Sequence, residues 1–132
     1  MIKGRFALFC DYALTSSDGK LSILGEFDHF HSSNDSPILQ KGFLVASFEG
    51  EANTNVTIGV KLAHEKGDNV VFERDFNITI GRGGRANILI EFGGLPFKQF
   101  GIYKATFSEG KKEITSANLG VSKVEQKSPA RS

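Results

Sequence analysis

The stretch 55–80 constrains the fold of this sequence more than any other feature, because apolar and polar residues alternate along it. From Val56 to Leu62 every second residue is apolar, and the alternation resumes at Val70 after the polar, glycine-containing segment 64–69. Successive side chains of a β-strand point to opposite faces, so each arm has one apolar face. A short polar connector between two such arms is typical of a hairpin turn. The sequence therefore predicts two antiparallel strands of a half-buried sheet.

Short segments of the same kind occur along most of the remaining chain. The predicted strands are residues 5–14, 20–30, 41–49, 56–63, 70–80, 86–92, 102–108 and 114–124. No longer segment repeats its apolar positions at the 3.6-residue period of a helix. About eight strands separated by turn residues predict an all-β protein, a single-domain antiparallel β-sandwich, with a small β-barrel as the alternative. We expect this domain to cover residues 1–124 and the polar segment 125–132 to form a flexible tail.

The first predicted strand carries apolar residues at alternate positions, which we expect to face the core. These residues are Phe6, Leu8, Cys10, Tyr12 and Leu14. Cys10 is the one cysteine of the chain, and on this face it is expected to be buried and unreactive. Gly25 interrupts the second predicted strand and indicates a bulge or a close backbone approach.

Charge and hydropathy argue against two classes of partner. Sixteen basic and fifteen acidic residues give the 132-residue chain a formal net charge of +1, so no overall field attracts it to nucleic acid or to an anionic membrane. No segment approaches the roughly 20 apolar residues that span a bilayer. The N-terminal residues lack the apolar core of a secretion signal. We therefore expect a cytoplasmic protein with no nucleic-acid partner, no membrane partner and no cofactor.

Three motifs carry a resemblance to known sequences. They are Asp11-Tyr12-Ala13-Leu14, the run Asp18-Gly19-Lys20-Leu21-Ser22-Ile23-Leu24-Gly25-Glu26-Phe27-Asp28, and Gly101-Ile102-Tyr103. Together they resemble an uncharacterised bacterial family of small all-β proteins of unknown function, over roughly residues 5–121. The pattern Asp-Gly-Lys-Leu-x-Ile-x-Gly-x-Phe-Asp is the most specific part. The resemblance implies an all-β domain, and it carries no known activity, substrate or catalytic residue.

Two histidines form the sharpest local signal for chemistry. His29 and His31 are two residues apart, so an extended strand places both imidazoles on one face, where they can bind one metal ion. Together with Asp35, their spacing is similar to the first metal motif of the cupin barrels. The second cupin motif is absent, since no histidine follows Pro96. The competing interpretation is two exposed histidines beside a polar loop.

The glycine-rich segment 81–85 places Arg82 and Arg85 beside backbone N–H groups that can form an anion cradle. The segment lacks the Lys-Ser/Thr of a phosphate-binding P-loop, and no helix is predicted after it. The competing interpretation is a structural turn with solvated arginines. Nucleic acid is not expected here either, because no basic strand carries interleaved aromatic residues.

Several apolar residues occupy positions where the alternation predicts a solvent-facing side chain. They are Phe9, Leu24, Phe30, Phe43, Val45, Leu89 and Ile102. A contiguous apolar patch on an outer sheet face marks an interface. The alternatives are bulges that reset the alternation and loops that cover the outer face.

No catalytic residue can be identified, and the chain has no Gly-x-Ser-x-Gly elbow. We therefore favour a non-catalytic interaction or assembly module over an enzyme. It is expected to bind itself or another protein through an apolar sheet face or edge. A metal-dependent enzyme or small-ligand binder with a site around the two histidines is the alternative.

Overall fold

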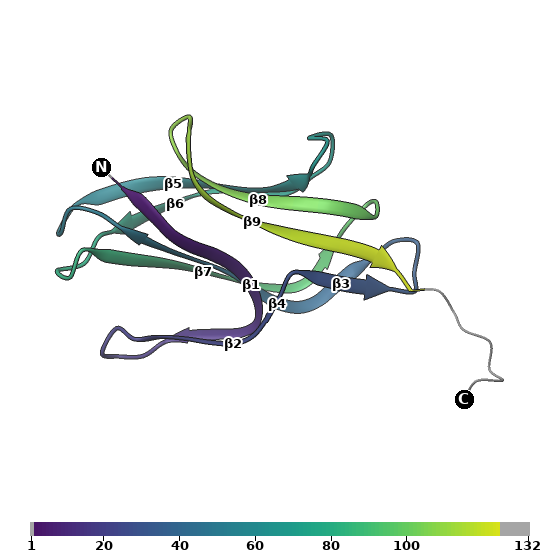
Figure 1. Cartoon of the computed structure of the whole chain (residues 1–132), viewed down its shortest axis with the longest axis horizontal. Helices are drawn as coiled ribbons and strands as arrows, with labels where there is room; N and C mark the ends of the chain where they lie inside the picture. Colours follow the sequence, from purple (N-terminus) through teal and green to yellow (C-terminus); the bar gives the residue numbers. More distant parts are fainter. Residues whose placement is uncertain (1, 125–132) are drawn as a thin grey trace.

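The computed structural model describes residues 2–124, so the predicted tail 125–132 lies outside the described residues. In the described part the chain forms nine β-strands and no helix (Figure 1). The strands are β1 (Lys3–Thr15), β2 (Leu21–Phe27), β3 (His29–Ser32), β4 (Ile38–Glu49), β5 (Asn55–His64), β6 (Val70–Thr79), β7 (Arg85–Pro96), β8 (Gly101–Glu109) and β9 (Lys112–Lys123). The predicted all-β fold is confirmed. Residues 2–124 contain no helix that is long and apolar enough to cross a membrane.

Two stacked sheets make up the molecule. Sheet A has the strand order β2-β1-β4-β7, and sheet B has the order β3-β9-β8-β5-β6. Neighbouring strands run antiparallel, except that β3 runs parallel to β9. Aromatic side chains from both sheets fill the space between them, and the rings of Phe48 and Phe107 lie 6.0 Å apart there. The structure is therefore the predicted β-sandwich, with its main core between the sheets.

The stretch 55–80 forms the predicted hairpin as β5 and β6 of sheet B. Val56 is paired with Ile78, and Ile58 is paired with Phe76. The apolar face of β5 is buried in the core, whereas Thr57 and its other polar neighbours are exposed or half-buried. The alternation therefore identified both strands and the inner face of β5. It is wrong at Val70, which is exposed, because the register of β5 and β6 shifts there.

The second predicted strand, residues 20–30, is divided between the two sheets. β2 ends at Phe27 in sheet A, and β3 begins at His29 in sheet B. Asp28 joins them, and its carbonyl oxygen accepts a 2.8 Å hydrogen bond from the Gly120 N–H of β9. The prediction of one continuous strand is wrong. The sequence does not reveal the crossing, because a chain that passes from one sheet to the other keeps an extended backbone and an unbroken apolar pattern.

β1 bends in its middle, and the hairpin that it forms with β2 folds back over the outer face of sheet A (Figure 1). We call residues 9–27 the β1–β2 hairpin, because Phe9 and Phe27 are its last paired residues. Strands β2 and β7 are opposite edges of sheet A, yet Leu21 of β2 and Asn87 of β7 line one groove. The hairpin must therefore cross the sheet's outer surface.

Gly25 lies opposite Asp11, where β1 leaves β4 and continues with β2 alone. Its φ of 72° belongs to the left-handed region that favours glycine. A side chain at this position would collide with the Asp11 carboxylate. The space beside Gly25 is therefore occupied by the Asp11 side chain and not by another backbone segment.

A second apolar cluster fills the space between the β1–β2 hairpin and sheet A. This outer-face cluster consists of the buried residues Cys10, Ala13, Phe43 and Val45, with Phe6, Leu8, Leu21, Ile23 and Leu89 packed against them. Sheet A is therefore covered by apolar side chains on both faces. A strand that is buried on both faces loses its apolar–polar alternation.

The predicted inner face of β1 is wrong for this reason. Phe9 faces the main core and is 1% exposed. Phe6, Leu8 and Cys10, which we expected in that core, belong to the outer-face cluster. Tyr12 and Leu14, expected inside as well, are exposed in the bent half of the strand.

Candidate functional site

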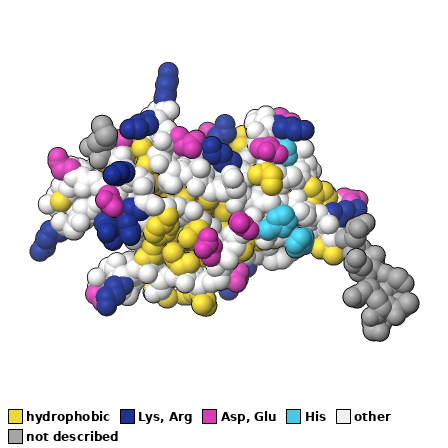
Figure 2. Space-filling model, viewed as in Figure 1, with side chains coloured by type: hydrophobic (Ala, Val, Ile, Leu, Met, Phe, Trp, Pro, Cys, Tyr) yellow, Lys and Arg dark blue, Asp and Glu magenta, His cyan; other side chains and the backbone are white. Residues whose placement is uncertain are grey.

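A groove of about 520 Å³ lies between the tip of the β1–β2 hairpin and the outer face of sheet A. Its volume is in the usual range for small-ligand sites. The groove is lined by Arg5, Phe6, Gly19, Lys20, Leu21, Ile23, Arg85 and Asn87. Figure 2 shows an apolar area at this place, above the hairpin, with Lys and Arg side chains along its left border. The groove thus combines an apolar lining with three cationic side chains.

Arg5 is held in place by three neighbours. Its Nη1 donates a 2.8 Å hydrogen bond to the hydroxyl of the buried Ser47, and its Nε lies 3.7 Å from the Glu49 carboxylate. The guanidinium also lies over the ring of Phe6, 5.5 Å from the ring centre. These contacts fix one cation at the wall of the groove.

The hairpin tip that forms the opposite wall is a hydrogen-bonded turn. The Gly19 N–H donates to the Ser16 carbonyl at 2.9 Å, and Lys20 forms a 3.7 Å ion pair with Asp18. The Ser16 hydroxyl donates to the Asp18 carboxylate and lowers the pKa of that carboxyl group. Asp18 is therefore ionised at neutral pH and balances the charge of Lys20.

The two arginines of segment 81–85 are placed differently. Arg85 begins β7 and lines the groove, whereas Arg82 lies in the exposed turn before it. The N–H groups of Gly81 and Gly84 donate to carbonyl groups of the same turn, each at 2.9 Å. These two N–H groups are already bonded, and of the two arginines only Arg85 lines the groove.

The predicted interface residues are dispersed over the described structure. Phe9 lies in the main core, Phe43 and Val45 lie in the outer-face cluster, and Phe30 and Leu89 are half-buried. Only Leu24, at 69%, and Ile102, at 41%, are exposed, and they belong to different sheets. The seven residues therefore do not form one outer patch, because they are divided between the main core, the covered outer face of sheet A and the exposed surfaces of two sheets.

A smaller exposed patch was missed in the sequence. Tyr12 is paired with Leu24 in the hairpin, and Leu14 is the next residue on the same face of β1. All three are exposed, and they alternate with Ala13 and Ile23, which join the outer-face cluster. The Tyr12 ring also reaches Phe43 of that cluster, with ring centres 5.5 Å apart. We call Tyr12, Leu14 and Leu24 the solvent face of the hairpin. An unbroken apolar run such as residues 43–46 indicates a strand that is covered on both faces. This run could have predicted that another segment covers the outer face of the sheet.

The two histidines of β3 do come together. The ring centres of His29 and His31 lie 4.8 Å apart, and His29 Nε2 lies 2.7 Å from the Ser122 hydroxyl. Asp35 instead pairs with the Lys123 ammonium at 2.7 Å, which lowers the pKa of its carboxyl group. Within residues 2–124 no three His, Cys, Asp or Glu side chains form a group that could hold a metal ion. The three-ligand site of His29, His31 and Asp35 is therefore not assembled.

Cys10 is buried in the outer-face cluster, as the sequence predicts. Burial raises the pKa of its thiol, and the bond from its Sγ to the Tyr12 carbonyl, at 3.4 Å, acts in the opposite direction. The net effect favours the neutral thiol over the reactive thiolate.

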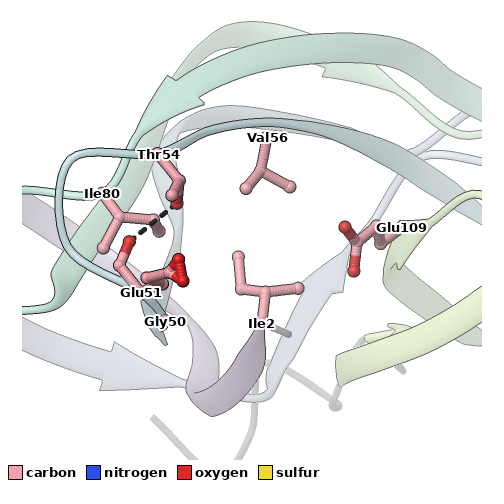
Figure 3. Close-up of a pocket in the computed structure, with 7 residues that line it drawn as sticks. All are labelled: Ile2, Gly50, Glu51, Thr54, Val56, Ile80 and Glu109. Atoms are coloured by element: carbon pink, nitrogen blue, oxygen red, sulfur yellow. Dashed lines mark hydrogen bonds between the residues drawn. The ribbon is translucent and has the colours of Figure 1, made fainter.

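A pocket of about 200 Å³ opens at the end of the sandwich, near the start of β1 (Figure 3). Ile2, Val56 and Ile80 form its apolar walls, and Glu51 and Glu109 provide two carboxylates. The Glu51 carbonyl accepts a 2.7 Å hydrogen bond from Thr54. The pocket is smaller than typical ligand sites, and the groove is the better candidate.

Comparison with known proteins identifies a sequence family and two similar structures. Residues 5–122 match the model of DUF6941, a family of unknown function. No curated protein matches the sequence. The structure is similar to an immunoglobulin-like protein from Pseudomonas aeruginosa, with 8% identity, a TM-score of 0.49 and coverage of 92% of this chain and 96% of that chain. It is also similar to a β-glucosidase from Listeria innocua, with 8% identity, a TM-score of 0.47 and coverage of 89% of this chain and 16% of that chain. The resemblance carried by the sequence motifs is confirmed, and the chain belongs to the DUF6941 family.

Proposed function

We propose that this protein is a non-catalytic assembly module that binds a second copy of itself through β2. One observation carries the proposal: β2 is an edge strand whose hairpin also exposes the apolar residues Tyr12, Leu14 and Leu24. An edge strand presents unpaired backbone N–H and C=O groups, which a strand of another chain can satisfy. Pairing at this edge would also cover part of the solvent face of the hairpin.

The other edges of the described sheets are less suited to such pairing. β3 is four residues long, whereas β2 has seven residues. β6 and β7 are the long edges of the two sheets, and they contact each other. Among the edges of residues 2–124, β2 is therefore the one that combines sufficient length with exposed apolar side chains in its hairpin.

Charge favours an antiparallel pair of β2 strands. Lys20 precedes β2, whereas Glu26 and Asp28 lie at its other end. In an antiparallel pair, the lysine of each copy faces the carboxylates of the other, whereas a parallel pair opposes like charges. An antiparallel edge pair is also compatible with two-fold symmetry, the commonest symmetry of protein dimers.

Native mass spectrometry and sedimentation over a concentration series test the proposal. We expect a dimer for the wild type and a monomer for Leu24→Asp, because the symmetric interface would contain two unpaired charges. Ile102→Asp is the matched control, since Ile102 is exposed on sheet B, and it should remain dimeric. A wild-type monomer at the highest soluble concentration, or a Leu24→Asp dimer of unchanged stability, would refute self-assembly through β2.

A further inference from the structure

We propose that the groove under the β1–β2 hairpin binds a small amphiphilic monocarboxylate. Its carboxylate would contact Arg85 and Asn87, and its apolar body would lie against Phe6, Leu21 and Ile23. The groove faces sheet A, on the opposite side of the hairpin from its solvent face. The inference therefore stands apart from assembly through the β2 edge.

The register of sheet A brings the polar end of the groove together. Phe6 of β1 is paired with Ser47 of β4, and Ser47 is paired with Asn87 of β7, so the three form one row across the sheet. Arg85 lies two residues before Asn87 and projects from the same face of β7. A guanidinium and a side-chain amide thus adjoin each other at one end of the groove. Both are donors that suit a carboxylate.

The charge balance of the groove selects a single negative charge. Arg5, Lys20 and Arg85 supply three positive charges to the lining. Glu49 pairs with Arg5 and Asp18 pairs with Lys20. Glu49 is also the cross-strand neighbour of Arg85, although no ion pair joins the two within the described residues. Two carboxylates thus face three cations, so one positive charge remains. A monoanion balances that charge, whereas a doubly charged phosphate would leave an excess negative charge beside Glu49 and Asp18.

The remaining lining favours an apolar body on the ligand. Phe6 comes from the sheet, and Leu21 and Ile23 come from the hairpin, so apolar walls face each other across the groove. All three side chains are half-buried and retain surface that a ligand can cover. Removing such surface from water is favourable in proportion to the apolar area covered. A carboxylate with an alkyl chain should therefore bind more tightly than acetate, which is too short to cover these three side chains.

Isothermal titration with sodium octanoate tests this site on the full chain. The comparison ligands are acetate, which lacks the long alkyl chain, octan-1-ol, which lacks the carboxylate, and inorganic phosphate, which lacks both and carries more negative charge. Saturable one-to-one binding of octanoate is expected, with acetate, octanol and phosphate each binding at least about tenfold more weakly.

Two arginine variants locate the binding site. Arg85→Gln should weaken octanoate binding about tenfold, because a charge-assisted hydrogen bond contributes that much to affinity. Arg82→Gln is the matched control, since Arg82 lies three residues away in the same turn and does not line the groove. Both residues are exposed, so both variants should fold. Equal affinities of the two variants, tighter binding of phosphate than of octanoate, or the absence of octanoate binding would each overturn the proposal.

Discussion

Replacing Phe43 by alanine tests whether the β1–β2 hairpin truly covers sheet A. Phe43 is 7% exposed in the outer-face cluster, and its ring meets that of Tyr12 edge to face, with ring centres 5.5 Å apart. Leu24 lies on the solvent face of the hairpin and is 69% exposed. The alternation of the sequence assigns both residues to an outer face, so Leu24→Ala is the matched control for Phe43→Ala.

The expected cost of Phe43→Ala follows from its burial. Truncating a buried phenylalanine costs about 3–5 kcal/mol. We expect about 3 kcal/mol, because the bent hairpin can close over part of the vacated space. An exposed side chain contributes less than about 0.5 kcal/mol, so Leu24→Ala should be nearly neutral. For a chain of 132 residues, an unfolding entropy of about 2.1 cal/mol/K per residue converts 3 kcal/mol into a melting temperature about 11 °C lower.

Thermal and urea unfolding followed by circular dichroism measure both variants. The measurements belong at a concentration where wild type and variants share one oligomeric state, because association itself raises the melting temperature. Similar melting temperatures for Phe43→Ala and wild type would refute a hairpin packed on sheet A. So would equal destabilisation by the two substitutions.

Three further changes test other contacts. Gly4→Ala should lower the free energy of unfolding by about 1–3 kcal/mol in urea titration, because the new methyl group would lie 2.8 Å from the Ile114 carbonyl oxygen of the facing sheet; unchanged stability would contradict this close approach. The Lys123 ammonium holds the pKa of Asp35 below its ordinary 3.8, so in an NMR titration Lys123→Met should return that pKa to 3.8, and an unmoved pKa would contradict the ion pair. Burial raises the pKa of the Cys10 thiol above its ordinary 9.0. Above pH 9.0 the unfolded chain therefore loses this proton before the folded chain does, and the free energy of unfolding falls with rising pH. In Cys10→Ala this fall should be shallower, and identical slopes for the variant and the wild type would contradict the burial effect.

The sequence predicted the sandwich best where a strand has one wet face. β5 alternates cleanly because Val56 and Ile58 face the core while Thr57 faces outward, and the short polar turn after His64 leaves few alternatives. The number of strands was nearly right as well. Composition and alternation are local properties, and they suffice for a half-buried hairpin.

The arrangement around the groove could not be predicted in the same way. In β4 every residue from Gly42 to Phe48 is buried, so alternation carries no information about which face is inside. The predicted strand 86–92 is too short, because β7 continues through Gly93 and Gly94, and Lys41 of β4 pairs with Gly93. Leu21 and Asn87 line the same groove only because β1 bends and carries β2 across the sheet. Such a bend is a tertiary property that local sequence patterns do not reveal.

The parallel pairing of β3 with β9 has a consequence for the order of folding. His29 and Ser122, which adjoin each other in that pair, are separated by 93 positions in the chain. Gly4 near the start of β1 also contacts β9, at Thr115. Contacts between such distant segments raise the contact order, and a high contact order slows folding. During synthesis the central β5–β6 hairpin can form as soon as it emerges, whereas β3 has no neighbour until β9 is made. The β3 edge of sheet B should therefore be the last part of the molecule to acquire its native hydrogen bonds. Until β9 has been synthesised, β3 is also the strand most exposed to misassociation.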